Sequence, residues 1–228
     1  MDVSADTAAG IFARAFVRDP FMRWAFPDAA RREAHLLRMF TPVSRAAVRF
    51  GGLVGNAAPS TTTAATTATA ATTATAATTA TAATTATAAT TAAVGWISGR
   101  HFPLGVAAQA RSGMYALPFR IPPPSLLRVL RHESFAERAL ERLVTERTAY
   151  LWVVGVEPEA QGTGEGGRVL RTALHEMAAA HDDCVLKTEN PANLPVYEHL
   201  GFRVERELHS PGGAPPVWLL RKPSLSGA

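Results

Sequence analysis

Apolar side chains in the first fifty residues recur at the spacing of amphipathic helices. A first stretch follows the i, i+3, i+4 rule at Ala8, Ile11, Phe12, Ala15 and Phe16. The dipeptide Asp19-Pro20 predicts the end of this helix, and Asp28 predicts the N-cap of a second one. The inner face of the second helix is expected to carry Leu36, Leu37 and Phe40.

The middle of the chain predicts two short strands and a long helical stretch. Residues 50–57 and 94–98 are the strand candidates, and residues 125–147 have helical periodicity. Ser134 and Glu137 have the spacing of a capping box, which leaves open a division of the long stretch into two helices.

The last third of the chain alternates strands and helices. Residues 150–156 form the strongest strand, apolar on both faces as in a central buried strand, and Gly155 predicts a bulge or a close backbone approach. A helix over residues 165–180 has two buried rows: Val169, Ala173 and Met177, then Leu170, Leu174 and Ala178. Strands follow at 184–186, 202–208 and 216–221, with a short helix at 194–200 that ends at the C′ glycine Gly201. This order predicts an α/β or α+β sheet domain.

Residues 60–93 interrupt this pattern, because they consist almost wholly of Thr and Ala. Without large apolar side chains the tract cannot bury enough surface to offset the entropy of ordering. We expect a low-complexity loop insertion within a single domain spanning residues 1–228. The alternative is a Thr-rich strand face, as on ice-binding surfaces, since the six-residue period is even. Such a face would carry Thr67, Thr69, Thr73 and Thr75.

Composition narrows the functional classes. No apolar run approaches the roughly 18 residues of a membrane span, and residues 1–10 lack the pattern of a secretory signal. The single cysteine, Cys184, cannot form an internal disulfide and is expected to be inert packing in a reducing cytoplasm. The net charge of +4 comes mostly from arginine, and over residues 128–146 the basic side chains alternate with glutamates. This alternation argues against nucleic-acid binding but is compatible with attraction of an anionic cofactor.

A glycine-rich turn joins the strongest strand to the following helix. It reads Gln161, Gly162, Thr163, Gly164, Glu165, Gly166 and Gly167. Glycines let backbone N–H groups converge on a ligand, and a helix N-terminus adds partial positive charge, so the turn predicts a phosphate cradle. The alternative is a tight strand–helix turn without a ligand. The pattern does not match G-x-G-x-x-G, and no Gly-Lys-Ser/Thr follows as in a P-loop. No metal site is expected.

Two motifs in order carry a family resemblance. Residues 156–166, Val-Glu-Pro-Glu-Ala-Gln-Gly-Thr-Gly-Glu-Gly, resemble the acetyl-CoA loop of the GNAT N-acetyltransferase superfamily, whose core is Gln/Arg-x-x-Gly-x-Gly/Ala. Residues 193–202, Asn-Leu-Pro-Val-Tyr-Glu-His-Leu-Gly-Phe, resemble its second motif. Together with residues 15–20 and 217–223, they are most similar to the puromycin N-acetyltransferase-like actinobacterial members.

The resemblance implies a mixed central sheet with a splayed strand pair, flanked by helices, and transfer of an acetyl group from acetyl-CoA to a small-molecule primary amine. The amine would attack directly in a ternary complex. By resemblance, the backbone at Val154 and Val156 pairs with the pantetheine arm, and the amides of residues 161–167 hold the pyrophosphate. Asn193 would contact CoA, and Tyr197 would protonate the departing thiolate. From the residues alone, Asn193 could instead be a helix N-cap and Tyr197 a core aromatic. The protein is expected to be a monomer or a homodimer.

The sequence departs from the family pattern at several points. Residues 1–7 are too short and polar for the usual opening strand, and Glu165 places a carboxylate beside the expected phosphate site. Lys187 stands where puromycin-type relatives carry Glu, with Glu189 two residues on. The general base is therefore unassigned. Two other functions stay open: a catalytically silent acyl-CoA-binding relic, and protein N-acetylation.

Overall fold

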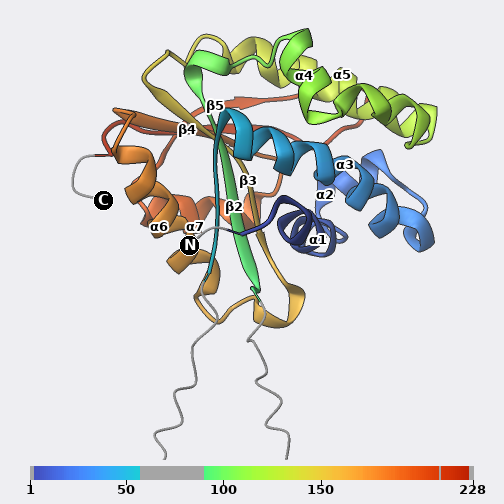
Figure 1. The fold of residues 1–228 in the computed structure, drawn as a ribbon, viewed down its shortest axis with the longest axis horizontal. Helices are drawn as coiled ribbons and strands as arrows, with labels where there is room; N and C mark the ends of the chain where they lie inside the picture. The colour runs from blue at the N-terminus through green and yellow to red at the C-terminus, as the bar shows by residue number, and fades with distance from the viewer. Residues whose placement is uncertain (1–2, 57–89, 211, 226–228) are drawn as a thin grey trace, which may run out of the picture.

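The computed structural model describes residues 3–56, 90–210 and 212–225, in which a mixed six-stranded sheet has helices on both faces (Figure 1). The spatial order of the strands is β1-β2-β3-β4-β6-β5, and only β3 and β4 are parallel neighbours. The strands are β1 Gly51–Gly55, β2 Ala92–Ser98, β3 Thr148–Val156, β4 Asp183–Thr188, β5 Arg203–Leu208 and β6 Val217–Lys222. The fold class expected from the sequence is thus confirmed.

Three helices precede the sheet: α1 Ala5–Ala15, α2 Pro20–Ala25 and α3 Ala29–Phe50. Asp28 caps α3 as predicted. Asp19-Pro20 does follow the first helix, but it also begins α2, because Pro20 stands at the first helical position and Asp19 accepts hydrogen bonds from two α2 amides. The prediction that Leu37 lies on the inner face of α3 is wrong, since this residue is 44% exposed.

Four further helical segments lie between β2 and β3. They are η1 Gly99–His101, α4 Val106–Ser112, η2 Met114–Phe119 and α5 Pro123–Leu140. The stretch predicted over 125–147 is one helix that ends at Leu140, so Ser134 and Glu137 lie in its interior and the two-helix alternative is wrong.

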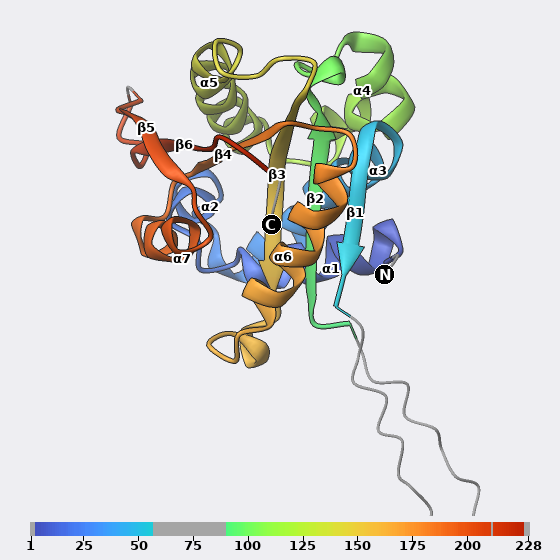
Figure 2. The ribbon, with the colours of Figure 1, turned by 90° about the vertical axis from the view of Figure 1, so that its left-hand side faces the viewer.

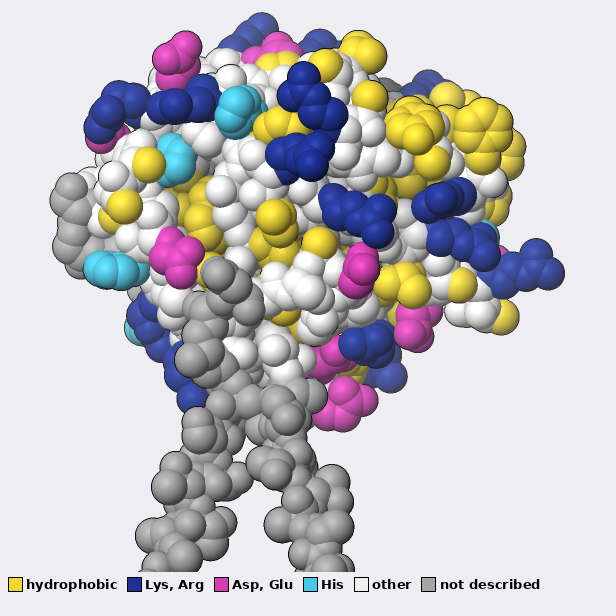
Figure 3. Space-filling view, in the orientation of Figure 1, with side chains coloured by type: hydrophobic (Ala, Val, Ile, Leu, Met, Phe, Trp, Pro, Cys, Tyr) yellow, Lys and Arg dark blue, Asp and Glu magenta, His cyan; other side chains and the backbone are white. Residues whose placement is uncertain are grey.

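On the face of the molecule in Figure 3, basic side chains are interspersed with acidic and apolar ones.

The remaining helical segments are η3 Pro158–Ala160, α6 Glu165–Ala178, η4 Pro191–Asn193 and α7 Leu194–His199. The two predicted rows of α6 face the core, with Ala178 partly buried at the end. Gly201 follows α7 with φ of 87°, which confirms the C′ glycine. Among the described residues, no helix is long and apolar enough to cross a membrane.

The sheet separates two apolar layers because neighbouring strand residues point to opposite faces. One layer joins α6 and α7 to β-strand residues that include Val94, Leu151 and Leu186. The other layer joins α1 to α3 with Leu53, Ala93 and Val153. Figure 2 shows α6 on one side of β2 and β3, and α1 and α3 on the other.

The Thr/Ala tract falls mostly outside the described residues, which omit 57–89, and so does its strand alternative. Its last residues, Ala92 and Ala93, are buried in β2. The two described ends lie side by side: Gly55 pairs with Ala93, and the Asn56 amide donates to the Ala92 carbonyl at 3.1 Å.

Candidate active site

Strand β3 loses its neighbour β4 halfway along. The parallel pairing runs from Thr148 opposite Asp183 to Leu151 opposite Leu186, whereas β2 continues to pair with β3 as far as Val156. An extra residue, Trp152, lies at the point of separation, because Gly95 pairs with Val153 but Trp96 pairs with Leu151. Such a bulge bends a strand and ends its pairing. The C-terminal half of β3 therefore has an unpaired edge.

The bulge is at Trp152 and not at Gly155. A Cβ on Gly155 would lie 2.6 Å from Cδ1 of Phe12, so this glycine allows α1 to approach the strand. The second of the two predictions for Gly155, close backbone approach, is the one that the structure confirms. It brings α1 against the unpaired half of β3.

The amides of Val154 and Val156 point toward the unpaired edge. Ala92 of β2 lies opposite Val156, and its N–H and C=O both form hydrogen bonds with Asn56, on the side of β2 away from β3. Ala92 and Val156 are therefore a non-hydrogen-bonded pair of the antiparallel ladder, in which the N–H and C=O of Val156 point away from β2. The Val156 carbonyl instead accepts a hydrogen bond at 3.1 Å from Nε2 of Gln161. Alternation along the strand gives Val154 the same orientation.

The glycine-rich turn leads from this edge to the N-terminus of α6. Gly162 and Gly164 have φ of 79° and 85°, and a Cβ on either would meet no atom within 4 Å. No side chain caps α6, whose first hydrogen bond runs from the Arg168 amide to the Gly164 carbonyl. The amides of residues 165–167 thus have no intrahelical acceptor. They form a site that favours an anion.

Glu165 is held away from these amides by two partners. Its Oε2 accepts from Nδ2 of Asn56 at 3.1 Å, and its Oε1 accepts from Nη2 of Arg168 at 2.7 Å. The ion pair with Arg168 offsets the carboxylate charge that the sequence pattern identified as unfavourable for a phosphate. Thr163 also bonds within the turn, donating to the Ala160 carbonyl at 2.7 Å.

Asn193 occupies the N-cap position of α7, as the alternative interpretation of this residue predicted, but its side chain makes no capping hydrogen bond. Nδ2 of Asn193 donates to Oγ1 of Thr188 at 3.4 Å, at the end of β4. The capping role belongs to Asn190, which accepts from the Ala192 amide at the start of η4.

Tyr197 is 9% exposed and lies in the layer under α6 and α7. Its ring meets Phe202 edge-on with centroids 5.9 Å apart. Burial, followed by the nearby charge of Glu189, raises the pKa of the Tyr197 phenol above its ordinary value. The hydroxyl therefore stays protonated at neutral pH and can act as a donor.

A comparison with known protein families identifies the family to which this chain belongs. A family model described as Acetyltransferase (GNAT) family matches residues 90–202, from two residues before β2 to the residue before β5. The chain belongs to the GNAT acetyltransferase family.

Solved structures of other acetyltransferases resemble part of this GNAT chain. The ribosomal-protein-S18-alanine N-acetyltransferase from Escherichia coli is 23% identical, covering 36% of this chain and 57% of its own, with a TM-score of 0.32. A spermidine N-acetyltransferase SpeG chimera from Vibrio cholerae and hSSAT is 24% identical, covering 35% and 52%, with a TM-score of 0.32. Nourseothricin acetyltransferase is 17% identical, covering 34% and 51%, with a TM-score of 0.31. The chain thus spans only about half the length of these structures.

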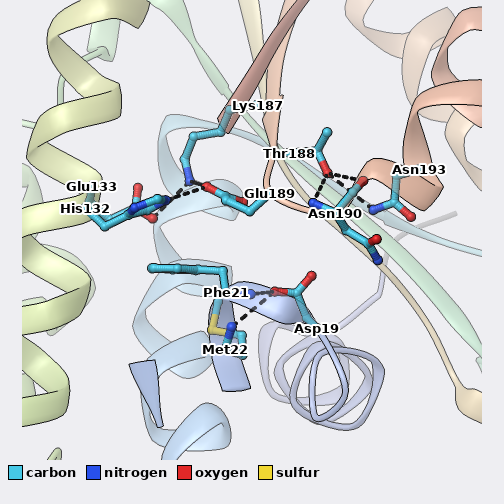
Figure 4. A network of polar contacts seen from close by, with 10 residues as sticks. All are labelled: Asp19, Phe21, Met22, His132, Glu133, Lys187, Thr188, Glu189, Asn190 and Asn193. Atoms are coloured by element: carbon cyan, nitrogen blue, oxygen red, sulfur yellow. Dashed lines mark hydrogen bonds and ion pairs between the residues drawn. The ribbon is translucent and has the colours of Figure 1, made fainter. Parts of the chain in front are cut away.

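A buried polar network lies next to the candidate site, where β4 ends against α2 and α5 (Figure 4). Nζ of Lys187 lies 2.6 Å from Oε1 of Glu189 and 3.0 Å from Oε1 of Glu133. Nε2 of His132 lies 3.3 Å from the same Glu189 oxygen, and its ring stacks on Phe21 at 4.3 Å. The sequence pattern pointed to Lys187 and Glu189 but not to His132. His132 is fully buried, although the alternating charges around it in the sequence are typical of an exposed helix face. Within the described ranges, no group of three or more His, Cys, Asp and Glu side chains is arranged to hold a metal ion.

Proposed function

We propose that this protein transfers an acetyl group from acetyl-CoA to a primary amine of a small molecule, by direct attack of the amine in a ternary complex. The proposal rests on two adjacent structural features. The amides at the N-terminus of α6 have no side-chain cap, and the strand that directly precedes them in the chain, β3, has an unpaired edge. An anion and an extended amide chain, the two parts of CoA that need recognition, fit these features in that order.

In this proposal acetyl-CoA lies along β3 with its pyrophosphate on the turn. The amides of Val154 and Val156 pair with the pantetheine arm, and the amide near Val156 polarises the thioester carbonyl. Gln161, Gly162, Thr163, Gly164, Glu165, Gly166 and Gly167 form the pyrophosphate site. Asn193, which lies beside Thr188 at the end of β4, contacts the cofactor. Acetyl-CoA supplies an activated acyl group, and the protein mainly aligns two reactants.

Tyr197 completes the proposed chemistry. When the amine has added to the thioester carbonyl carbon, the C–S bond breaks and the electron pair stays on sulfur. The phenol of Tyr197 donates a proton to that thiolate. Its raised pKa keeps the proton available over the neutral range.

The puromycin N-acetyltransferase-like members of the family are the subgroup to which we assign the chain, on the motifs at residues 15–20, 150–202 and 217–223. This assignment favours a small-molecule acceptor over a protein. Lys187 occupies the position where those relatives carry Glu, so we do not propose puromycin itself as the acceptor.

A thiol-release assay tests the function. Acetyl-CoA is offered with a panel of aminoglycosides, polyamines and aminonucleosides, and free CoA is measured against reactions without enzyme and without amine. Amine-dependent release is the expected result. Binding of acetyl-CoA by calorimetry without any release would favour the catalytically silent alternative, and absence of binding would contradict the cofactor site as well.

A further inference from the structure

The two carboxylate oxygens of Asp19 have different environments. Its Oδ1 accepts hydrogen bonds from the amides of Phe21 at 2.9 Å and Met22 at 3.2 Å, which begin α2. Within the part of the chain that the structure describes, no hydrogen bond or ion pair to its Oδ2 is recorded. Figure 4 shows the Asp19 carboxyl directed toward the space between α2 and the end of β4, facing Glu189 and Asn190.

Glu189 is a carboxylate whose charge acts on Asp19, and it is engaged in an ion pair with Lys187. The same oxygen contacts both Lys187 and His132, and the attraction of Lys187 holds the pKa of Glu189 well below its usual range despite burial. A carboxylate committed to an ion pair is a weak proton acceptor. The lysine at position 187 thus removes Glu189 from the candidates for the general base.

Asp19 has the opposite environment. Burial is the largest cause that raises its pKa, to about 6, and the charge of Glu189 raises it further, whereas the α2 amides and Lys187 lower it. A base with a pKa close to the working pH transfers protons most effectively. Tyr197 lies within the field of both Asp19 and Glu189, each of which raises the pKa of its phenol. Asp19, Glu189 and Tyr197 therefore lie within electrostatic range of one another, near the place where the end of β4 faces α2 (Figure 4).

We propose that the free oxygen of Asp19 binds the ammonium group of the acceptor and removes its proton. This inference rests on the proposed function and assigns the general base that the sequence left open. The groups that face Asp19 are Glu189 and Lys187 from the end of β4 and Tyr197 from α7, with His132 of α5 stacked on its neighbour Phe21.

The proton balance of the step is complete. Asp19 takes one proton from R–NH3⁺, which leaves the lone pair of R–NH2 free to form the C–N bond to the thioester carbonyl carbon. The C–S bond breaks, and Tyr197 gives a proton to the sulfur. The second proton on nitrogen returns to the Tyr197 oxygen through water, and Asp19 releases its proton to solvent. One ammonium and one thioester become one amide, one thiol and one solvent proton.

The substitution Asp19→Asn tests the assignment, because asparagine keeps the oxygen that caps α2 and loses only the charge. The acceptor is the amine of the panel with the highest turnover, and kcat/KM is measured across the pH range. In the wild type, activity should fall on the acid side around pH 6, since protonated Asp19 cannot bind the ammonium. In Asp19→Asn only the uncharged amine reacts, so kcat/KM should be about 10²–10⁴-fold lower at neutral pH. It should also rise about tenfold per pH unit up to the pKa of the amine.

Asp28→Asn is the matched control. Asp28 caps α3 in the same way, through the amides of Ala30 at 3.0 Å and Arg31 at 3.3 Å, but its side chain is exposed. This variant should keep the wild-type pH profile. Calorimetry should give the same acetyl-CoA affinity for the wild type and both variants.

Three outcomes would overturn the assignment while leaving the enzyme function intact. The first is an acid limb that Asp19→Asn leaves unchanged. The second is an acid limb that disappears in Glu189→Gln but not in Asp19→Asn. The third is a loss of acetyl-CoA affinity in Asp19→Asn as large as its loss of activity. Carbon-13 titration of the carboxyl groups gives a readout without an acceptor: the signal missing in Asp19→Asn should titrate near pH 6 in the wild type. A value at or below the ordinary aspartate pKa would also contradict the proposal. Failure of the wild type to acetylate any amine would count against the proposed function itself.

Discussion

At the scale of single residues, one substitution can separate the packing of Tyr197 from its proposed chemical role. Its ring packs on Phe202, and its hydroxyl is the proposed proton donor. Tyr197→Phe keeps the ring and removes the hydroxyl, so turnover should fall by roughly 10²–10⁴-fold while acetyl-CoA affinity stays the same. Because burial raises the pKa of the phenol, any alkaline limb from this residue in the wild type should lie above the ordinary tyrosine pKa of about 10. Tyr115→Phe, at an exposed ring on η2, is the control. Equal turnover in both variants would show that another group protonates the sulfur.

Gly164 is a second residue whose local geometry yields a specific prediction. Its φ of 85° lies in the left-handed region, and its surroundings are empty, so Gly164→Val introduces backbone strain and a side chain beside the α6 amides without a clash inside the protein. The affinity for CoA should fall tenfold or more, about 1.4 kcal/mol per decade. Gly113 at the end of α4 has φ of 88° and equally open space. Gly113→Val should therefore cost similar stability but leave CoA affinity unchanged in calorimetry.

At the scale of elements, the sequence predicts strand and helix bounds best where the apolar periodicity and the helix-ending or turn residues agree. The predicted strands and helices after Tyr150 lie within a few residues of their expected bounds. Apolar runs mark the strands there, and Gly201 marks the end of a helix. The short elements α2 and α4 were missed, since a helix of six or seven residues has too few positions to show a period. The glycine-rich turn could be found from local pattern alone. The network of Lys187, Glu189 and His132 could not, because the last lies 55 residues before the first and contact between them depends on how α5 packs on the sheet.

Lys187 links β4 to α5, and its removal should weaken that junction. Lys187→Met would leave Glu189 buried without its cation, a change that typically costs about 3–5 kcal/mol of unfolding free energy. Lys222→Met, at the only other lysine of the chain, is the matched control in urea unfolding and should change stability by less than about 0.5 kcal/mol. Similar losses in the two variants would contradict a special role for the buried pair.

The pH dependence of the same variant has a definite sign. In the wild type, the lowered pKa of Glu189 stabilises the fold above the ordinary glutamate pKa, and this stability is lost as the pH falls through the lowered value. Without Lys187, burial would raise the pKa of Glu189, so the folded variant would bind a proton that the unfolded chain does not. The deficit of Lys187→Met relative to the wild type should therefore narrow as the pH falls from about 7 to 5.

At the scale of the whole molecule, the position of the Thr/Ala tract between neighbouring strands decides what its removal should do. The tract connects β1 to β2, which are antiparallel partners, and the residues that flank it are already joined. Oδ1 of Asn56 accepts from the amides of Thr91 and Ala92 at 2.9 and 2.8 Å, and the Thr91 carbonyl accepts from the Glu157 amide at 2.7 Å. These bonds fix the two strand ends independently of the connection between them.

Deleting residues 60–89 and closing the chain with a short turn should therefore change the melting temperature by only a few degrees. The entropy of closing a loop grows slowly with length, by about 0.6 kcal/mol for each doubling, so a shorter connection should stabilise the fold slightly. CoA affinity should also stay unchanged, because Asn56 would still bind the Glu165 carboxylate at the N-terminus of α6. Thr91 must be retained, and a deletion extended through it is the matched variant, which should lose stability together with the bond to Glu157. Differential scanning calorimetry on both deletions makes the comparison. A loss of several kcal/mol in the shorter deletion would mean that the tract packs against the domain, and the loop interpretation would then be wrong.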